Sequence, residues 1–131
     1  MKGIDTNVLV RYIVQDDPEQ SKLAAQFIEQ LDCDEIPIFI NGIILCELIW
    51  VLESAYGYAR QDIALVIEKI LLTRQFYIYD SDVLWQSLRD YRSAGADFSD
   101  NYIGHLNVRQ GCEHTVTFDK RAARLSYFKL L

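Results

Sequence analysis

The chain has 131 residues, of which 50% are apolar and 24% are charged, a composition typical of one globular domain with its own core. Its formal net charge of −6 argues against simple electrostatic binding to nucleic acid. The longest apolar run, residues 43–52, is interrupted by Glu47 and is shorter than the roughly 20 residues that cross a bilayer. No signal-peptide pattern is seen. These properties predict a single domain, residues 1–131, in the cytoplasm and away from the membrane.

The predicted elements alternate between short apolar strands and amphipathic helices. Strands are expected at residues 1–4, 36–40, 76–79, 114–117 and 127–131. Helices are expected at residues 8–14, 18–31, 43–56, 60–73, 83–93 and 97–109. Helix-start signals are expected from Asn7, from Asp17 with Pro18, from the turn 41–42, and from residues 80–82. This order predicts an α/β fold of three layers, α/β/α, with a mostly parallel central sheet.

Five acidic residues follow strands or begin helices at places where this class of fold collects its ligands. Asp5 follows the first strand, and Asp119 follows the fourth. Glu47 lies two turns into the helix after the second strand, while Asp97 and Asp100 begin a later helix. Right-handed crossovers bring the carboxyl ends of parallel strands to one edge of the sheet. The five carboxylates are therefore expected to meet in one crevice.

Four of these acids also have a plainer interpretation. Glu47 stands alone in an apolar stretch, so it is either buried with a partner, a metal ion or a proton, or it simply faces water. Asp97 and Asp100 share a helix face at a spacing of three, and a role at the helix N-terminus is the alternative for both. Asp119 is equally well placed to cap the chain that follows it.

Taken together, the five acids favour a metal-binding site over these separate interpretations. Carboxylates that converge in a crevice repel one another, and a fold tolerates this when divalent cations are bound. Ligation by oxygen alone favours Mg²⁺ or Mn²⁺ over Zn²⁺. Two such ions about 3.5–4 Å apart activate a water molecule and stabilise the leaving oxygen of a phosphodiester. We expect Thr6 to support the neighbouring acid by hydrogen bonding.

Other chemistries lack their motifs. His105 and His114 have no ligand spacing, no Gly-x-Ser-x-Gly elbow is present, and neither GxGxxG nor a Walker A sequence occurs. Cys33, Cys46 and Cys112 form no CxxC pair and are expected to be reduced thiols, with Cys46 in the core. Most of the aromatic residues between positions 50 and 85 are also expected in the core, whereas Tyr56 and Tyr58, which flank Gly57, are candidates for exposure on a loop, in contact with a partner or with bases. A basic stretch, residues 109–129, either tracks phosphates or is a solvated face.

Four segments resemble PIN-domain proteins, in particular the VapC toxins of VapBC toxin–antitoxin modules, in the order found in that family. They are residues 1–12 with Asp5-Thr6-Asn7, residues 45–48 with the mid-helix Glu47, residues 96–104 with the second acidic motif, and residues 115–119 with a strand and Asp119. Asn101 and Tyr102 depart from the pattern, since small residues commonly follow the second motif.

The resemblance implies a magnesium-dependent (or manganese-dependent) endoribonuclease of a type II toxin–antitoxin system with an RNA substrate. It implies the catalytic residues Asp5, Glu47, Asp100 and Asp119, the metal ligands Asp5, Asp100, Glu47 and Asp97, and the supporting residues Thr6, Asn7 and Thr117. Asp5 and Asp100 are expected to be the main ligands, ahead of Asp97. A homodimer and a DNA-binding, VapB-like antitoxin that covers the toxin's groove are also implied.

Two alternatives remain from the sequence. The first is a catalytically silent PIN module that binds RNA or a protein partner. The second is a phospho-acceptor protein that uses Asp5. It fits less well, because haloacid-dehalogenase-like phosphatases have an aspartate where this chain has Asn7, and receiver domains have a second acid where it has Ile4.

Overall fold

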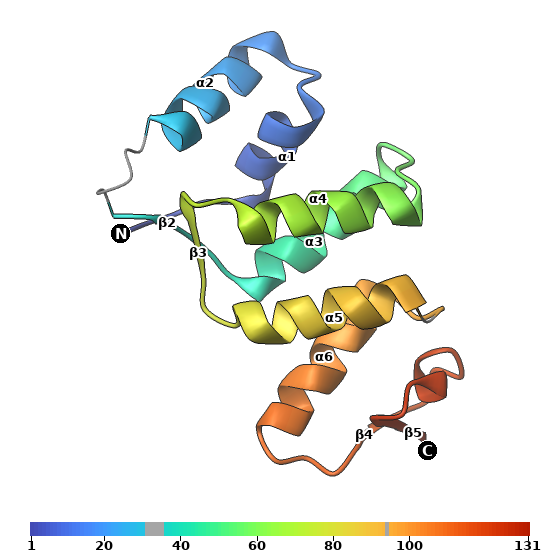
Figure 1. Cartoon of the computed structure of the whole chain (residues 1–131). Helices are drawn as coiled ribbons and strands as arrows, with labels where there is room; N and C mark the ends of the chain where they lie inside the picture. The colour runs from blue at the N-terminus through green and yellow to red at the C-terminus, as the bar shows by residue number, and fades with distance from the viewer. Residues whose placement is uncertain (31–35, 94) are drawn as a thin grey trace. The chain divides into compact units, whose positions relative to one another are not determined.

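The computed structural model describes residues 1–30, 36–93 and 95–131, and these fall into two units, Met1–Asp80 and Ser81–Leu131 (Figure 1). Each unit has its own parallel sheet. In the first unit the strand order is β1 (Lys2–Gly3), β2 (Ile38–Ile40), β3 (Phe76–Ile78). In the second unit β4 (Thr115–Thr117) pairs with β5 (Phe128–Leu130). The predicted strands and their parallel pairing are confirmed, with pairs formed inside each unit.

Four helices accompany the sheet of the first unit: α1 (Thr6–Val14), α2 (Pro18–Glu29), α3 (Gly42–Ser54) and α4 (Arg60–Leu72). Asp17 caps α2 by accepting from the backbone N–H of Gln20, and Pro18 is its first residue, both as predicted. Asn41 caps α3 in the same way. The predicted end of α2 at Leu31 and the thiol of Cys33 lie outside the described residues.

The prediction that Asn7 caps the first helix is wrong. Asp5 is the N-cap of α1, with extended backbone and a side chain that accepts from the N–H of Thr6. Asn7 lies inside the first turn of the helix. Both Asp5 and Asn7 are good N-cap residues, so residue type alone could not show where α1 begins. The start of the helix depends instead on where β1 ends.

Helix α3 is apolar on nearly all sides, but only one side lies in the core. Leu45, Leu48 and Leu52 are fully buried. Ile43 and Trp50 are each 69% exposed on the opposite face. The expectation that most aromatic residues between positions 50 and 85 are buried is wrong, since each is half-buried or exposed; these residues are Trp50, Tyr56, Tyr58, Phe76, Tyr77, Tyr79 and Trp85.

The second unit is built from α5 (Ser81–Ser93), α6 (Phe98–Arg109), the 3-10 helix η1 (Ala122–Arg124) and its two strands. Helix α5 begins at Ser81, two residues before the predicted start, so Asp82 lies in its first turn and accepts from Arg109 Nη1 at 2.8 Å. Tyr91 on α5 packs edge-on against Phe98 on α6, with ring centroids 5.8 Å apart, and both are buried. This pair forms the centre of the unit's core.

None of the helices in the described residues is long and apolar enough to cross a membrane. The thiols of Cys46 and Cys112 are free. Cys46 is half-buried, and burial raises the pKa of its thiol to about 11, so it is protonated at neutral pH.

Candidate active site

Two of the predicted site acids, Asp5 and Glu47, are joined through Thr6. The backbone N–H of Thr6 donates to Asp5 Oδ1 at 2.7 Å, and Thr6 Oγ1 donates to Glu47 Oε2 at 2.6 Å. Thr6 itself is buried, whereas both acids are exposed. One threonine therefore fixes an oxygen of each carboxylate.

Asp5 and Glu47 line one pocket of about 400 Å³, together with Thr6, Asn7 and Arg11. The pocket lies between α1 and the C-terminal part of α3, since Val51, Ala55 and Tyr56 complete its lining. Glu47 is exposed, so of the two interpretations of this residue the structure supports the one in which it faces water. Its hydrogen bond to Thr6 nevertheless holds it beside Asp5.

Arg11 is a candidate site residue that the sequence did not single out. Its Nη1 donates to Asp16 Oδ1 at 2.8 Å and lies 3.3 Å from the hydroxyl of Tyr56, while Nε donates to Gln20 Oε1 at 2.7 Å. Hydrogen bonding to Asp16 and Tyr56 raises the pKa of Arg11, so its guanidinium stays protonated and positively charged. Arg11 lies four residues after Asn7 on the same face of α1, and this spacing could have identified it as a site residue from the sequence.

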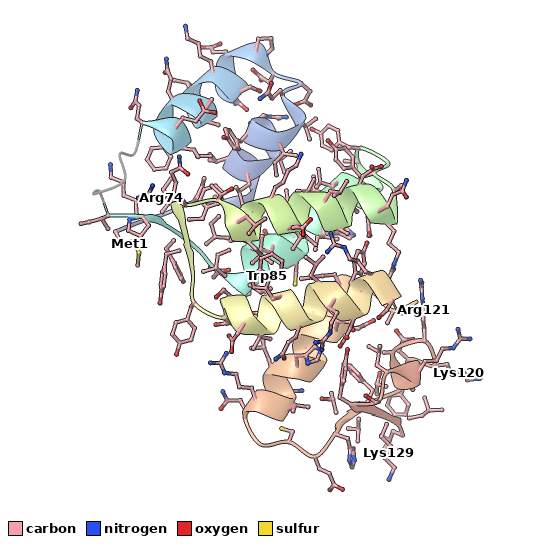
Figure 2. The ribbon with its side chains drawn as sticks, viewed as in Figure 1. Met1, Arg74, Trp85, Lys120, Arg121 and Lys129 are labelled. Carbon is pink, nitrogen blue, oxygen red and sulfur yellow. The ribbon has the colours of Figure 1, made fainter. Side chains whose placement is uncertain are left out.

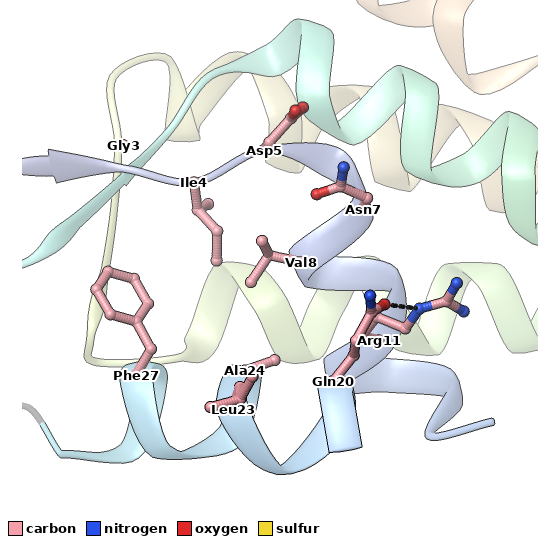
Figure 3. Close-up of a pocket in the computed structure, with 10 residues that line it drawn as sticks. All are labelled: Gly3, Ile4, Asp5, Asn7, Val8, Arg11, Gln20, Leu23, Ala24 and Phe27. Atoms are coloured by element: carbon pink, nitrogen blue, oxygen red, sulfur yellow. Dashed lines mark hydrogen bonds between the residues drawn. The ribbon is translucent and has the colours of Figure 1, made fainter. Parts of the chain in front are cut away.

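A second, larger pocket of about 690 Å³ lies between α1 and α2 and reaches Asp5 (Figure 3). Asp5, Asn7 and Arg11 line both pockets, so they form a polar ridge between them. The rest of the larger pocket is mainly apolar, with Ile4, Val8, Leu23, Ala24 and Phe27. Leu23 is 61% exposed at this apolar surface.

The acids of the second unit are arranged around the start of α6. Asp97 is the N-cap residue by position, but its side chain makes no capping hydrogen bond, and it is exposed. Asp100 is half-buried, one turn further along. Burial raises the pKa of Asp100, the nearby charges of Asp97 and Asp119 raise it further, and Arg121 acts in the opposite direction.

Asp119 has a clear structural role. Its Oδ1 accepts from the backbone N–H groups of Arg121 at 2.8 Å and Ala122 at 3.3 Å, so it caps the turn that leads into η1. Thr117 Oγ1 accepts from the backbone N–H of Asp119 at 3.0 Å, which ties this turn to the end of β4. The capping interpretation is therefore correct for Asp119, and it occupies only one of the two carboxylate oxygens.

The donor chemistry of these acids fits a hard divalent cation. All the candidate ligands are carboxylates, and burial, followed by the charges of Asp97 and Asp119, raises the pKa of Asp100, effects that a bound cation would offset. Among the described residues, no group of three or more His, Cys, Asp or Glu side chains that could hold a metal ion is found. Asp5 and Glu47 belong to one unit and Asp97, Asp100 and Asp119 to the other. The convergence of all five remains a prediction.

The basic residues of positions 109–129 are mostly exposed. Lys120, Arg121 and Lys129 lie around η1 and the strands of the second unit (Figure 2). Arg109 is paired with Asp82, and Arg121 donates from Nε to the carbonyl of Gly95 at 2.6 Å. Lys120 and Lys129 are exposed to solvent at this surface.

The PIN domain family matches residues 3–126 of this chain, a range that includes the five acids and most of both units. The chain belongs to the PIN domain family, and the predicted α/β class of fold is confirmed. The chain is also similar to the "VapC ribonuclease" of Aquifex aeolicus (strain VF5). The two are 26% identical over 127 residues, which is 97% of this chain and 93% of that protein.

Proposed function

We propose that this chain is a magnesium- or manganese-dependent endoribonuclease, the toxin of a type II toxin–antitoxin system, in which residues 1–131 act as one PIN domain. The observation that carries the proposal is the pair of carboxylates that Thr6 holds side by side in an open pocket, Asp5 and Glu47. Family membership and the similarity to a VapC ribonuclease support it. We place the protein in the cytoplasm.

Asp5, Glu47, Asp97 and Asp100 would hold the divalent cation, with Asp5 and Asp100 as the main ligands and Asp119 as a further acid. A bound Mg²⁺ or Mn²⁺ supplies an activated water and neutralises charge on the cleaved phosphodiester. The protein's own contribution is positional. Thr6 orients Asp5 and Glu47, Thr117 holds the Asp119 turn, and Asn7 lies on the polar ridge beside them.

Cleavage of a labelled RNA pool by the purified protein, freed of any partner, tests this function. We expect cuts with Mg²⁺ or Mn²⁺, none with EDTA, and none by a folded Asp5→Asn variant, which keeps the size of the side chain and loses its charge. Full cleavage by Asp5→Asn would disprove the mechanism. RNA binding without any cleavage by the folded, metal-loaded protein would instead favour the silent PIN module.

We assign the larger pocket, between α1 and α2, to the antitoxin. Its apolar lining suits a partner segment, and it extends to Asp5, so an occupant would cover the candidate active site. Leu23→Glu places a charge on this exposed apolar surface and should weaken co-purification with the antitoxin while RNA cleavage persists. Leu65→Glu, at an exposed site on α4 outside this pocket, is the matched control. Equal retention of the antitoxin by both variants would contradict the assignment.

We also propose that the toxin is a homodimer, as its resemblance to VapC toxins implies. Light scattering of the purified chain, alone and with its antitoxin, measures this directly. A monomer at concentrations where RNA is cleaved would show that one copy is sufficient for the reaction.

A further inference from the structure

Asn101 is a fully buried polar residue beside the candidate metal ligands, and no part of the proposed mechanism uses it. It follows Asp100 directly in α6, and its exposed fraction is 0%. Asparagine is a poor helix former, because its side chain competes for backbone hydrogen bonds. Burying an amide is unfavourable unless its donor and acceptor atoms are paired. A buried asparagine at this position therefore needs a specific arrangement of partners.

The partners of Asn101 lie at the start of the helix and at the C-terminal end of the chain. Its Nδ2 donates to the backbone carbonyl of Asp97 at 3.0 Å, and its own backbone N–H donates to the same carbonyl at 3.2 Å. Its Oδ1 accepts from the hydroxyl of Tyr127. The side chain thus connects the first turn of α6 to the residue that precedes β5.

This connection fixes Asp97 through its backbone. The Asp97 side chain makes no capping bond, and its backbone is held by the two bonds from Asn101 to its carbonyl and by a hydrogen bond from its own N–H to the Asp100 carboxylate. Asp100 lies within the same turn. Removing the Asn101 amide deletes the side-chain bond of this pair and leaves the backbone bond in place.

Tyr127 is itself held firmly. Its ring lies 4.6 Å from the ring of His105 and packs over Gly104, where a Cβ atom would come within 2.1 Å of Tyr127 Cδ2. Its hydroxyl also lies 3.4 Å from Asp90 Oδ2, which in turn is 2.6 Å from His105 Nε2. Burial and the charge of Asp90 raise the pKa of Tyr127, so the hydroxyl keeps the proton that it donates to Asn101.

We propose that Asn101 and Tyr127 are positioning residues that set the carboxylates of Asp97 and Asp100 for metal binding. The inference rests on the proposed function, in which these two acids are ligands. Groups that orient metal ligands typically change metal affinity by roughly 10–100-fold when they are mutated. A purely structural tie between α6 and the neighbouring sheet would leave metal affinity unchanged.

The chain offers a matched control for this distinction. At the other end of α6, Asn107 Nδ2 donates to Thr115 Oγ1 at 2.9 Å, which ties the helix to β4. Tyr127→Phe removes the hydrogen bond near the acids, and Thr115→Val removes the one far from them. Both substitutions preserve side-chain shape.

The test is Mn²⁺ binding by titration calorimetry to the whole protein, with thermal unfolding measured beside it. We expect the Kd for Mn²⁺ to rise roughly tenfold in Tyr127→Phe and to stay unchanged in Thr115→Val. A double variant, Asn101→Leu with Tyr127→Phe, leaves no unpaired buried acceptor, so it should regain stability while its Mn²⁺ affinity stays weak.

An unchanged Kd in the double variant, or an equal rise in Thr115→Val, would overturn the inference while the proposed nuclease stands. Failure of the wild-type protein to bind Mn²⁺ would remove the proposed metal site, and the inference would fall with it. The two failures are therefore distinguished in one series of titrations.

Discussion

Asp100 of the second unit is held differently from Asp5 and Glu47 of the first unit. In the first unit, Asp5 and Glu47 are exposed, and each accepts a hydrogen bond from Thr6. In the second unit, Asp100 is half-buried, and burial raises its pKa, with the charges of Asp97 and Asp119 raising it further. Hydrogen bonds to the charged form keep a carboxylate in place without an ion, whereas burial and repulsion favour the neutral form. We therefore expect a bound cation to organise Asp100 more than it organises Asp5 and Glu47.

The largest expected effect comes from removing charge in the second unit. Asp100→Asn should reduce RNA cleavage by more than the roughly 100-fold that follows loss of an outer-shell partner of a metal. Asp97→Asn should cost less, about tenfold, because Asp97 is expected to be the secondary ligand. Initial rates on a labelled RNA at saturating Mn²⁺ measure both. Equal losses of activity would show that Asp97 and Asp100 contribute equally as metal ligands.

Removing the hydrogen bond that organises the first unit should have a smaller effect. Thr6→Val keeps the shape of the side chain and deletes the donor to Glu47, so cleavage should fall about tenfold with little change in thermal stability. Thr73→Val is the control, since Thr73 donates to the carbonyl of Lys69 away from the pockets. If both variants cleave like the wild type, Thr6 does not orient Glu47 for catalysis.

Two substitutions of Asp119 separate its structural contribution to the stability of the fold from its electrostatic contribution. Asp119→Ala loses both hydrogen bonds to the Arg121–Ala122 turn and should lower the free energy of unfolding by about 1 kcal/mol. Asp119→Asn retains an acceptor oxygen and removes the charge that repels Asp100, so it should be near neutral. Denaturant unfolding in EDTA compares the two. A destabilisation of the same size in Asp119→Asn would mean that charge, not capping, holds the turn.

The smallest expected effect concerns stability and pH. Without metal at pH 7, Asp100→Asn should raise the free energy of unfolding by about 0.5 kcal/mol, a small gain because solvent screens a half-buried charge. The folded-state pKa of Asp100 lies above the unfolded value of 3.8, so the folded protein binds the proton more tightly. The cost of the charged carboxylate is present above the folded-state pKa and disappears as the pH falls below 3.8. Unfolding curves of both proteins from pH 3 to 7 should therefore converge at the acid end, and a constant gap would exclude this cause.

Much of the fold could be predicted because its signals are local. Asp17 and Pro18 mark the start of α2, Asn41 marks the start of α3, and short apolar runs mark the strands. Four of the acids were found for the same reason, since each follows a strand or begins a helix, and Glu47 was found because it is the one acid in an apolar run. Local signals cannot show how distant segments meet, so whether all five acids share a crevice remains a prediction.

What the sequence left open or missed also has physical causes in particular residues. Helix α3 is apolar on nearly all sides, so its pattern left open whether Glu47 is buried or faces water, and the residue shares an exposed face with Ile43 and Trp50. Asp5 and Asn7 are both good caps, and the choice depended on where β1 ends. The bond between Asn101 and Tyr127 spans 26 residues, and no pattern within either segment indicated it.

Gly104 limits how this part of the chain can change over evolutionary time. A Cβ at this position would lie 2.1 Å from Tyr127 and 2.9 Å from Phe128, so a substitution as small as alanine displaces the aromatic residues that follow η1. Glycine at 104 and an aromatic residue at 127 should therefore be gained and lost together among related proteins. A relative with a larger residue at the first position is expected to carry a smaller one at the second, and the two columns of an alignment would then vary as a pair.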